Sequence, residues 1–474
     1  MDRCTVKLPG MDGQTSVLLR DAAVAGHGAV DVLLADGHVA AIGRDLVPGC
    51  QACEVIDCHR AALLPGLHDH HIHLFATAAA ATSVPCGPPD VRTLEQLAIA
   101  LRQARPVGGW IRGVGYDEGV AGALDSRALD RLRADVPTRV QHRSGALWIL
   151  NTAGLATLLG GPNGLDPATQ PPGVERDHHG RPTGRLWRAD AWLSERLGGL
   201  VPAALGAVSR RLAGFGVTGV TDATPTLSTA ALAAISGDAV LQRVTALGDA
   251  SGPGPWKIVL ADHDLPSWDL LRAAVHDVRP RPVALHCVTA TALLLALSVL
   301  DDLGTVAGDR VEHAAVTPPE VAVRLAAMRV AVVTQPSLPA RRGDEYLDRV
   351  DAVDQPYLWP FRSLLDAGVR VACSSDAPYG DVDPWASVAA ATERLTPSGR
   401  PIAGRERVSA AAALNAYLGP PGDPGGAPRR VEVGVPADLV LLAQPLAVAL
   451  RRPRDVEVRA TFISGRRVAG EGSS

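Results

Sequence analysis

The sequence predicts an α/β protein, with a (β/α)₈ TIM-like barrel and a small β-sandwich built from both chain termini. Short apolar strands alternate with helical patterns through the middle of the 474 residues, and several of these strands end in histidine or aspartate. Both ends of the chain show strands and turns only. We expect residues 1–64 and 426–474 to form the sandwich and residues 65–425 the barrel, with an insertion at about 85–200.

The terminal strands are predicted from apolar runs and turn residues. Asp36-Gly37 separates two apolar runs and is a strong hairpin signal. Further strands are expected over residues 16–20, 30–35, 38–42 and 54–57, and over 437–442 and 458–465 near the other end. Because neither set is large enough to fold alone, we expect the two ends to share one domain.

The first barrel strand carries the highest density of histidine in the chain. Residues 64–74 hold four of the fourteen histidines. In an extended segment the side chains alternate, so His71, His73 and Asp69 point to one side, and His68 and His70 to the other. His-x-His is a metal-ligand spacing, although a histidine-rich turn produces the same short motif.

Three later strands end in residues of the same chemistry. Residues 283–286 end in His286, residues 310–313 in His313, and residues 369–376 in Asp376. All strands of a barrel point their carboxyl ends at one face, so these side chains should meet His71 and His73 there. Each residue alone is more often structural, but the ordered set predicts a site for zinc or a similar divalent ion, with one position left for water.

Lysine is rare in this chain, since only Lys7 and Lys257 among the 46 basic residues are lysines. Lys257 lies in an apolar strand just before the one that ends in His286. Burial lowers the pKa of a lysine and frees a nucleophilic amine, which can take up carbon dioxide and bridge two metal ions as a carbamate. The alternative is an ordinary lysine whose ammonium reaches solvent.

The stretch 64–73 resembles the signature of the amidohydrolase superfamily, and residues 434–440 resemble its C-terminal motif. Residues 110–118, 144–151, 181–184, 285–286, 311–313 and 375–378 resemble the amidohydrolase 3 branch, which contains N-substituted formamide deformylase-like proteins. The resemblance implies a metal-dependent hydrolase with His71, His73, Lys257, His286, His313 and Asp376 at metal or catalytic positions. The chain departs from the branch at Ala146, around Arg188 and at Asp262-His263, which puts the substrate in question.

We therefore expect one or two divalent ions, with N6-carboxylysine at Lys257 in the two-ion case, and hydrolysis of a C–N bond in a small amide or formamide. Asp376 would act as general base and acid, and His313 or His286 would polarise the carbonyl group. Asp69 would support the ligands from behind. Substrate contacts are expected from loops after the strands, at Tyr116, Asp117, His142, Arg143, Gln335 and Tyr379, and at Arg341 and Arg342.

Two other functions fit the same residues. One is deamination of a heterocycle at a single metal ion, which needs no bridging lysine. The other is a binding or regulatory protein on a decayed barrel, which the changes at Ala146 and Arg188 would permit.

Composition limits the partners. A net charge of −4 gives no reason to expect nucleic acid or an anionic membrane. Seven scattered cysteines and the absence of a signal-like N-terminus predict a cytoplasmic protein. A homodimer is the ordinary expectation for a soluble enzyme.

Overall fold

The computed structural model describes residues 16–47, 53–159, 173–197 and 204–470. Internal contacts divide the chain into two units, one comprising Met1–Leu74 and Leu205–Ser474, the other Phe75–Ala204. In the described part of the chain, no helix is long and apolar enough to cross a membrane.

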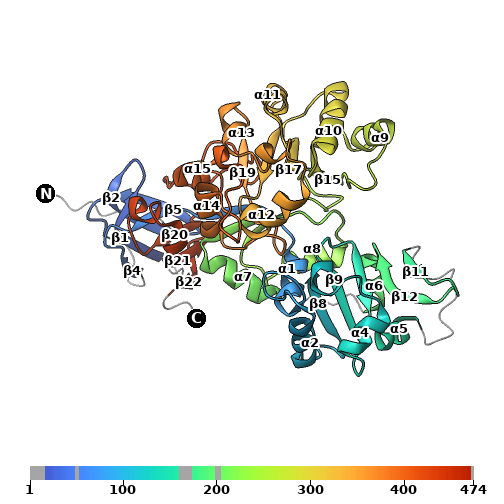
Figure 1. Cartoon of the computed structure of the whole chain (residues 1–474). Helices are drawn as coiled ribbons and strands as arrows, with labels where there is room; N and C mark the ends of the chain where they lie inside the picture. The colour runs from blue at the N-terminus through green and yellow to red at the C-terminus, as the bar shows by residue number, and fades with distance from the viewer. Residues whose placement is uncertain (1–15, 48–52, 160–172, 198–203, 471–474) are drawn as a thin grey trace. The chain divides into compact units, whose positions relative to one another are not determined.

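Both ends of the chain contribute to one sheet of the first unit. Its order is β22-β21-β20-β5-β1-β2-β3, and β4 also pairs with β1. Early and late strands lie side by side where β5 pairs antiparallel with β20 (Figure 1). The strands are β1 (Ser16–Val24), β2 (Gly28–Ala35), β3 (His38–Gly43), β4 (Cys53–Asp57), β5 (Ala62–Pro65), β20 (Leu439–Leu442), β21 (Val458–Ile463) and β22 (Arg466–Gly470). The expected hairpin at Asp36-Gly37 joins β2 to β3. A sandwich of two packed sheets stays a prediction.

The remaining strands of this unit are parallel and fall into two sheets. One has the order β14-β13-β6 and the other β15-β16-β17-β18-β19. Their bounds are β6 (Leu67–Ile72), β13 (Val217–Asp222), β14 (Arg243–Ala246), β15 (Trp256–Val259), β16 (Val283–Cys287), β17 (Arg310–His313), β18 (Ala331–Thr334) and β19 (Val371–Cys373). Backbone hydrogen bonds from Lys257 N to Leu247 O (3.3 Å) and from Asp376 N to His71 O (2.8 Å) connect the sheet edges. The described strands do not form one closed ladder, so barrel closure stays a prediction.

Helices alternate with these strands, as the sequence pattern predicts. They are α7 (Leu205–Gly214), α8 (Thr229–Ile235), α9 (Trp268–Val278), α10 (Ala290–Leu303), α11 (Pro319–Ala327), α12 (Ser337–Arg349), α13 (Arg362–Asp366), α14 (Pro384–Glu393), α15 (Ala410–Asn415) and α16 (Leu446–Ala449). Short 3₁₀ helices cover Gln355–Tyr357, Gly404–Glu406 and Pro453–Asp455. Serine or threonine side chains cap several N-termini; Thr289, for example, accepts from the amide of Ala292 at the start of α10.

The second unit has its own sheet, in the order β11-β12-β10-β9-β8-β7. Its elements are β7 (Val84–Pro85), β8 (Ile111–Tyr116), β9 (Thr138–His142), β10 (Leu147–Leu150), β11 (Val174–Arg176), β12 (Pro182–Trp187), α2 (Leu94–Gln103), α3 (Glu118–Ala121), α4 (Ser126–Leu132), α5 (Thr152–Leu159) and α6 (Asp190–Arg196). Helix α1 (Leu74–Ala81) begins at the boundary between the units. Helix α2 begins after Thr93, which caps it by accepting from Gln96 N.

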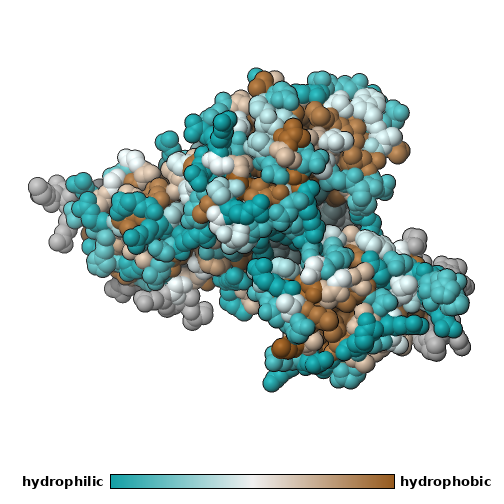
Figure 2. Space-filling model, in the orientation of Figure 1, coloured by the Kyte–Doolittle hydropathy of each residue, from teal (hydrophilic) through white to brown (hydrophobic). Residues whose placement is uncertain are grey.

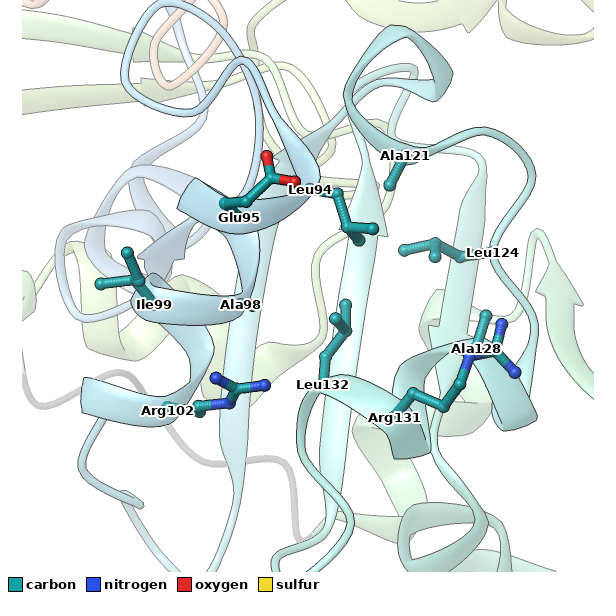
Figure 3. Close-up of a pocket in the computed structure, with 10 residues that line it drawn as sticks. All are labelled: Leu94, Glu95, Ala98, Ile99, Arg102, Ala121, Leu124, Ala128, Arg131 and Leu132. Carbon is teal, nitrogen blue, oxygen red and sulfur yellow. The ribbon is translucent and has the colours of Figure 1, made fainter.

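Apolar side chains gather on one face of the second unit (Figure 2). Helices α2 and α4 and the segment after α3 line a hollow of about 580 Å³ there (Figure 3). Leu94, Ala98 and Leu132 line it together with the cations Arg102 and Arg131. Among the residues that the structure describes, none of the predicted metal ligands lines this hollow.

Candidate metal centre

His71, His73 and Asp376 form the centre of the site. Each offers one ligand atom, and these atoms all lie within 4.8 Å of one another. The Nε2 atoms of His71 and His73 each lie 3.4 Å from Asp376 Oδ1. His71 is buried, whereas the His73 side chain is 20% exposed. Two imidazoles and one carboxylate from opposite ends of the chain therefore converge within the reach of a single ion.

Local backbone geometry brings these ligands together. Strands β6 and β13 shift register twice against each other. Strand β19 ends at Cys373, and Asp376 follows in a loop with a φ of 50°. His313 has a φ of 73°. Left-handed backbone in non-glycine residues is costly and is concentrated at functional sites, so the surrounding contacts must hold Asp376 and His313 in place.

Asp69 connects the first strand to the loop that carries Asp376. Its Oδ1 accepts from His71 N (3.1 Å) and from Ser375 N (3.0 Å). A further backbone bond runs from His73 N to Ala377 O (3.0 Å). Burial raises the pKa of Asp69 to about 6, against these hydrogen bonds. Asp69 thus joins the backbone of His71 to that of Ser375, next to Asp376.

His286 and His313 continue the cluster on neighbouring strands. His313 Nε2 lies 2.8 Å from His286 Nδ1, and the rings of His71 and His313 are 4.9 Å apart. His313 Nδ1 lies 4.0 Å from Asp376 Oδ2 and 2.9 Å from Gln335 Oε1. The four histidines and Asp376 predicted from strand ends are therefore brought together.

Lys257 is buried on β15, and within the described ranges its ammonium nitrogen has no hydrogen-bond partner. Burial lowers the pKa of Lys257 to about 8, although the charge of Glu312 acts in the opposite direction. A substantial neutral fraction near neutral pH is what carbamate formation requires.

The electrostatics of the cluster suit a cation. Burial lowers the pKa of His71 to about 3, and it also lowers the pKa values of His286 and His313. Neutral imidazoles keep the lone pair that a metal needs. Burial alone would raise the pKa of Asp376, but the hydrogen bond with His73 and the electrostatic interactions with the neighbouring histidines together outweigh burial and hold this pKa well below its usual range.

The residues fit a divalent ion on a second ground. His71 Nε2 is buried and has no hydrogen-bond partner among the residues that the structure describes. An orphaned buried nitrogen costs free energy unless something satisfies it. Nitrogen and carboxylate ligands in this combination are those that zinc accepts.

Glu312 belongs to the cluster, but the sequence analysis did not select it. It is fully buried on β17, accepts a hydrogen bond from His71 Nδ1, and pairs with Arg310. Burial acts to raise the pKa of Glu312, but Arg310, His71 and Lys257 together outweigh burial and hold this pKa well below its usual range. The available signal was an Arg-x-Glu pair in a strand where apolar residues are expected.

The predicted substrate residues fall into two groups. Gln335 is buried, with its amide nitrogen 2.9 Å from Ser374 Oγ, and Tyr379 lies edge-on to His73 with ring centroids 6.0 Å apart. The other group belongs to the second unit. There Arg143 pairs with Asp117 (2.7 Å), His142 lies 2.9 Å from Glu118, and the hydroxyl of the buried Tyr116 donates to Gly122 O. The four predicted residues Tyr116, Asp117, His142 and Arg143 thus lie together within the second unit.

The two main departures from the family pattern lie side by side in the second unit. Arg188 N donates to Ala146 O at 2.7 Å, and Arg188 has a φ of 49°.

Parallel strands that bring histidine and aspartate ligands within reach of one ion define the class of metal-dependent hydrolases. The sequence pattern of the Amidohydrolase family matches residues 54–253 and 269–469. The chain therefore belongs to the amidohydrolase family, and it is a hydrolase that acts on carbon–nitrogen bonds.

Individual relatives agree with this membership. An N-substituted formamide deformylase of Arthrobacter pascens is 27% identical over an alignment 514 residues long, gaps included, which spans 92% of this chain and 94% of that protein. The crystal structure of an uncharacterized metal-dependent hydrolase from Pyrococcus horikoshii OT3 matches with a TM-score of 0.72 at 18% identity, over 93% of this chain and all of that one. N-isopropylammelide isopropylaminohydrolase from Burkholderia multivorans has a TM-score of 0.56 at 18% identity, over 97% of this chain and all of that one. The two structures show similarity of fold.

Proposed function

We propose that this protein hydrolyses an amide- or formamide-type C–N bond in a small molecule, using a divalent metal ion. The observation that carries the proposal is the convergence of His71, His73 and Asp376, with ligand atoms within 4.8 Å of one another and a buried, unpartnered Nε2 on His71. The name of the Arthrobacter relative supports a formamide among the candidate substrates.

The proposed ligands are His71, His73, His286, His313 and Asp376, and the expected metal is zinc. When bound, such an ion lowers the pKa of water and polarises a carbonyl oxygen. Lys257 is the proposed ligand for a second ion. Its neutral amine would attack the carbon of carbon dioxide, forming an N–C bond and releasing one proton. The resulting carbamate is negatively charged and would therefore attract a second cation.

Asp376 is the proposed proton carrier. Its low pKa keeps the carboxylate ionised, so it accepts a proton from the attacking water and returns it to the leaving nitrogen. His313 and His286 lie on adjacent strands beside it and would stabilise negative charge on the carbonyl oxygen. Asp69 keeps the loop of Asp376 against the first strand.

Several wider proposals accompany this one. The eight parallel strands would close as a TIM-like barrel over residues 65–425 with the insertion at about 85–200, and residues 1–64 and 426–474 would form the sandwich. Substrate would contact Tyr379 and Gln335, beside the proposed ligands. The expected contacts at Tyr116, Asp117, His142 and Arg143 stay a prediction. We propose a cytoplasmic homodimer that binds neither nucleic acid nor membrane.

The test is a screen of zinc-loaded protein against N-formyl and N-acyl amines, with released amine as the readout. Turnover of these compounds is the expected result. Release of ammonia from heterocyclic amines instead would establish the single-metal deaminase, for which His71, His73 and Asp376 supply a sufficient ligand group. Metal binding without turnover of either class would favour the decayed barrel.

A further inference from the structure

His71 is held from behind by two charged residues of a single strand. Glu312 and Arg310 are two residues apart on β17, and both are about 99% buried or more. Glu312 Oε2 accepts from His71 Nδ1, while Arg310 Nε donates to the other carboxylate oxygen, Oε1. Both oxygens of Glu312 are therefore engaged.

The direction of the His71–Glu312 hydrogen bond is fixed by chemistry. An ionised carboxylate only accepts, so the hydrogen on the imidazole must lie on Nδ1. The lone pair of the neutral ring is then on Nε2, the atom that lies 3.4 Å from Asp376 Oδ1. Nε2 is also the ring atom without a hydrogen-bond partner in the described residues.

Arg310 has a second contact that reaches the first strand itself. Its Nη2 donates to the backbone oxygen of His70, at 2.8 Å. One guanidinium therefore fixes both the carboxylate that holds the ring and the backbone next to that ring. The planar fork of arginine can make these two bonds at once, which the single ammonium of a lysine cannot do with the same geometry.

Stability alone is a weak reason for such a group. Burying an ion pair costs desolvation that its attraction repays only in part, and well-packed apolar residues often serve as well. On the neighbouring strand β18, the residues paired with Arg310 and Glu312 are the buried apolar Ala331 and Val333. The charges of β17 are thus placed where they orient a neighbour.

We propose that Glu312 and Arg310 are a positioning pair that fixes the Nδ1–H tautomer of His71, so that Nε2 faces the centre as a metal ligand. This inference rests on the proposed function, because it assigns His71 to the metal. It adds two residues of this chain to the requirements of the site.

The first measurement is the imidazole nitrogen chemical shifts of metal-free protein labelled at histidine, with the His71 signal identified by its loss in His71→Asn. The Nδ1–H tautomer is expected for His71 in the wild-type protein. Glu312→Gln keeps the shape of the side chain but offers an amide N–H as well as an oxygen, so it should shift His71 toward the other tautomer. A wild-type His71 with its hydrogen on Nε2 would overturn the inference, even if the variant does not fold.

The second measurement is zinc affinity by competition with a chromogenic chelator. Glu312→Gln should weaken binding by about 10- to 100-fold. Arg310→Lys should weaken it less than Arg310→Gln, because the charge beside Glu312 is retained. The matched control is Glu406→Gln, since Glu406 is also buried but bonds Ser363 N and Oγ. Equal zinc affinities of the wild type and Glu312→Gln would contradict the positioning role. If Glu312→Gln loses unfolding free energy but keeps the His71 tautomer and the zinc affinity, the pair has only a structural role.

The two measurements separate this inference from the proposed function. If the wild-type protein binds no zinc, the proposed function fails, and the tautomer of metal-free His71 still decides the role of Glu312. If the wild-type protein binds zinc but Glu312→Gln binds it equally well, only the positioning role is lost.

Discussion

The backbone amide of Asp376 donates to the backbone oxygen of His71 at 2.8 Å, so two proposed ligands from opposite ends of the chain are joined directly. Asp69 adds two more bonds to the same junction, to His71 N and Ser375 N. The geometry of the site therefore depends on backbone contacts between the first and last parallel strands, and not only on the ligand side chains.

Replacing Asp376 by asparagine should remove the proton carrier and keep an oxygen in the same place. We expect Asp376→Asn to lower kcat by about 100- to 10,000-fold, the usual contribution of general acid–base catalysis, with zinc content largely retained. Steady-state turnover and metal analysis of purified protein measure both quantities. Asp344→Asn is the control, because Asp344 bonds Thr396 and Ser398 away from the ligands. Full activity in Asp376→Asn would refute the proposed mechanism.

Asp69 should matter for the stability of the junction. Asp69→Ala leaves the amides of His71 and Ser375 without their acceptor, and each buried unpaired amide costs about 1–3 kcal/mol. Asp69→Asn keeps an oxygen and should cost clearly less. Urea unfolding of the two variants makes the comparison. Equal losses of unfolding free energy in both would show that the charge, and not the two hydrogen bonds, stabilises this region.

Much of the fold could be predicted from sequence because its strands are short apolar runs with clear ends. The hairpin at Asp36-Gly37 and the strands that end in His286 and His313 are confirmed at or near their expected bounds. Strand β5 pairs with β20, while the division into a sandwich and a barrel stays a prediction. Local patterns are enough for such elements, since propensity and turn chemistry act over a few residues.

The finer geometry of the site depends on tertiary contacts that no local pattern contains. The two register shifts between β6 and β13 arise from the pairing of these strands, and beyond β19 the backbone amide of Asp376 bonds to His71 O on β6. The role of Glu312 depends on its hydrogen bond with His71, which lies 241 residues away in the sequence. No local pattern contains this contact. Packing against a partner strand, and not propensity, decides these features.

Lys257 should decide between one and two metal ions. If its amine is carboxylated, Lys257→Ala should lose about one ion per chain and most activity, because the bridging carboxylate is gone. Metal analysis of protein prepared with added bicarbonate measures this loss. The control is Lys7→Ala, which changes the other lysine of the chain. An unchanged metal content in Lys257→Ala would support a single ion and the deaminase alternative.

Asp438 should stabilise the contact between the terminal sheet and β14. Its Oδ1 accepts from Ser464 N at 2.8 Å, and Arg243 donates to its Oδ2. Since the Arg243 side chain is 54% exposed, we expect Arg243→Ala to cost at most about 1 kcal/mol. Asp438→Ala should cost about 1–3 kcal/mol, because it also leaves the Ser464 amide unpaired. Chemical denaturation measures the loss of unfolding free energy in both variants. A larger loss for Arg243→Ala than for Asp438→Ala would contradict the prediction.

Metal removal should destabilise the folded protein, because the ligands of the site are buried together and His71 Nε2 has no partner in the described residues. A ligand that binds only the folded state stabilises it by about 2.7 kcal/mol at a concentration of 100 times its Kd. Chelated protein should therefore melt at a lower temperature and recover when zinc is added. Magnesium should restore much less, since it prefers oxygen ligands and binds imidazole poorly. His73→Ala should respond to zinc far more weakly than wild type, because His73 supplies one of the three converging ligand atoms. An equal rise in melting temperature for His73→Ala and wild type would mean that zinc stabilises the protein from another site.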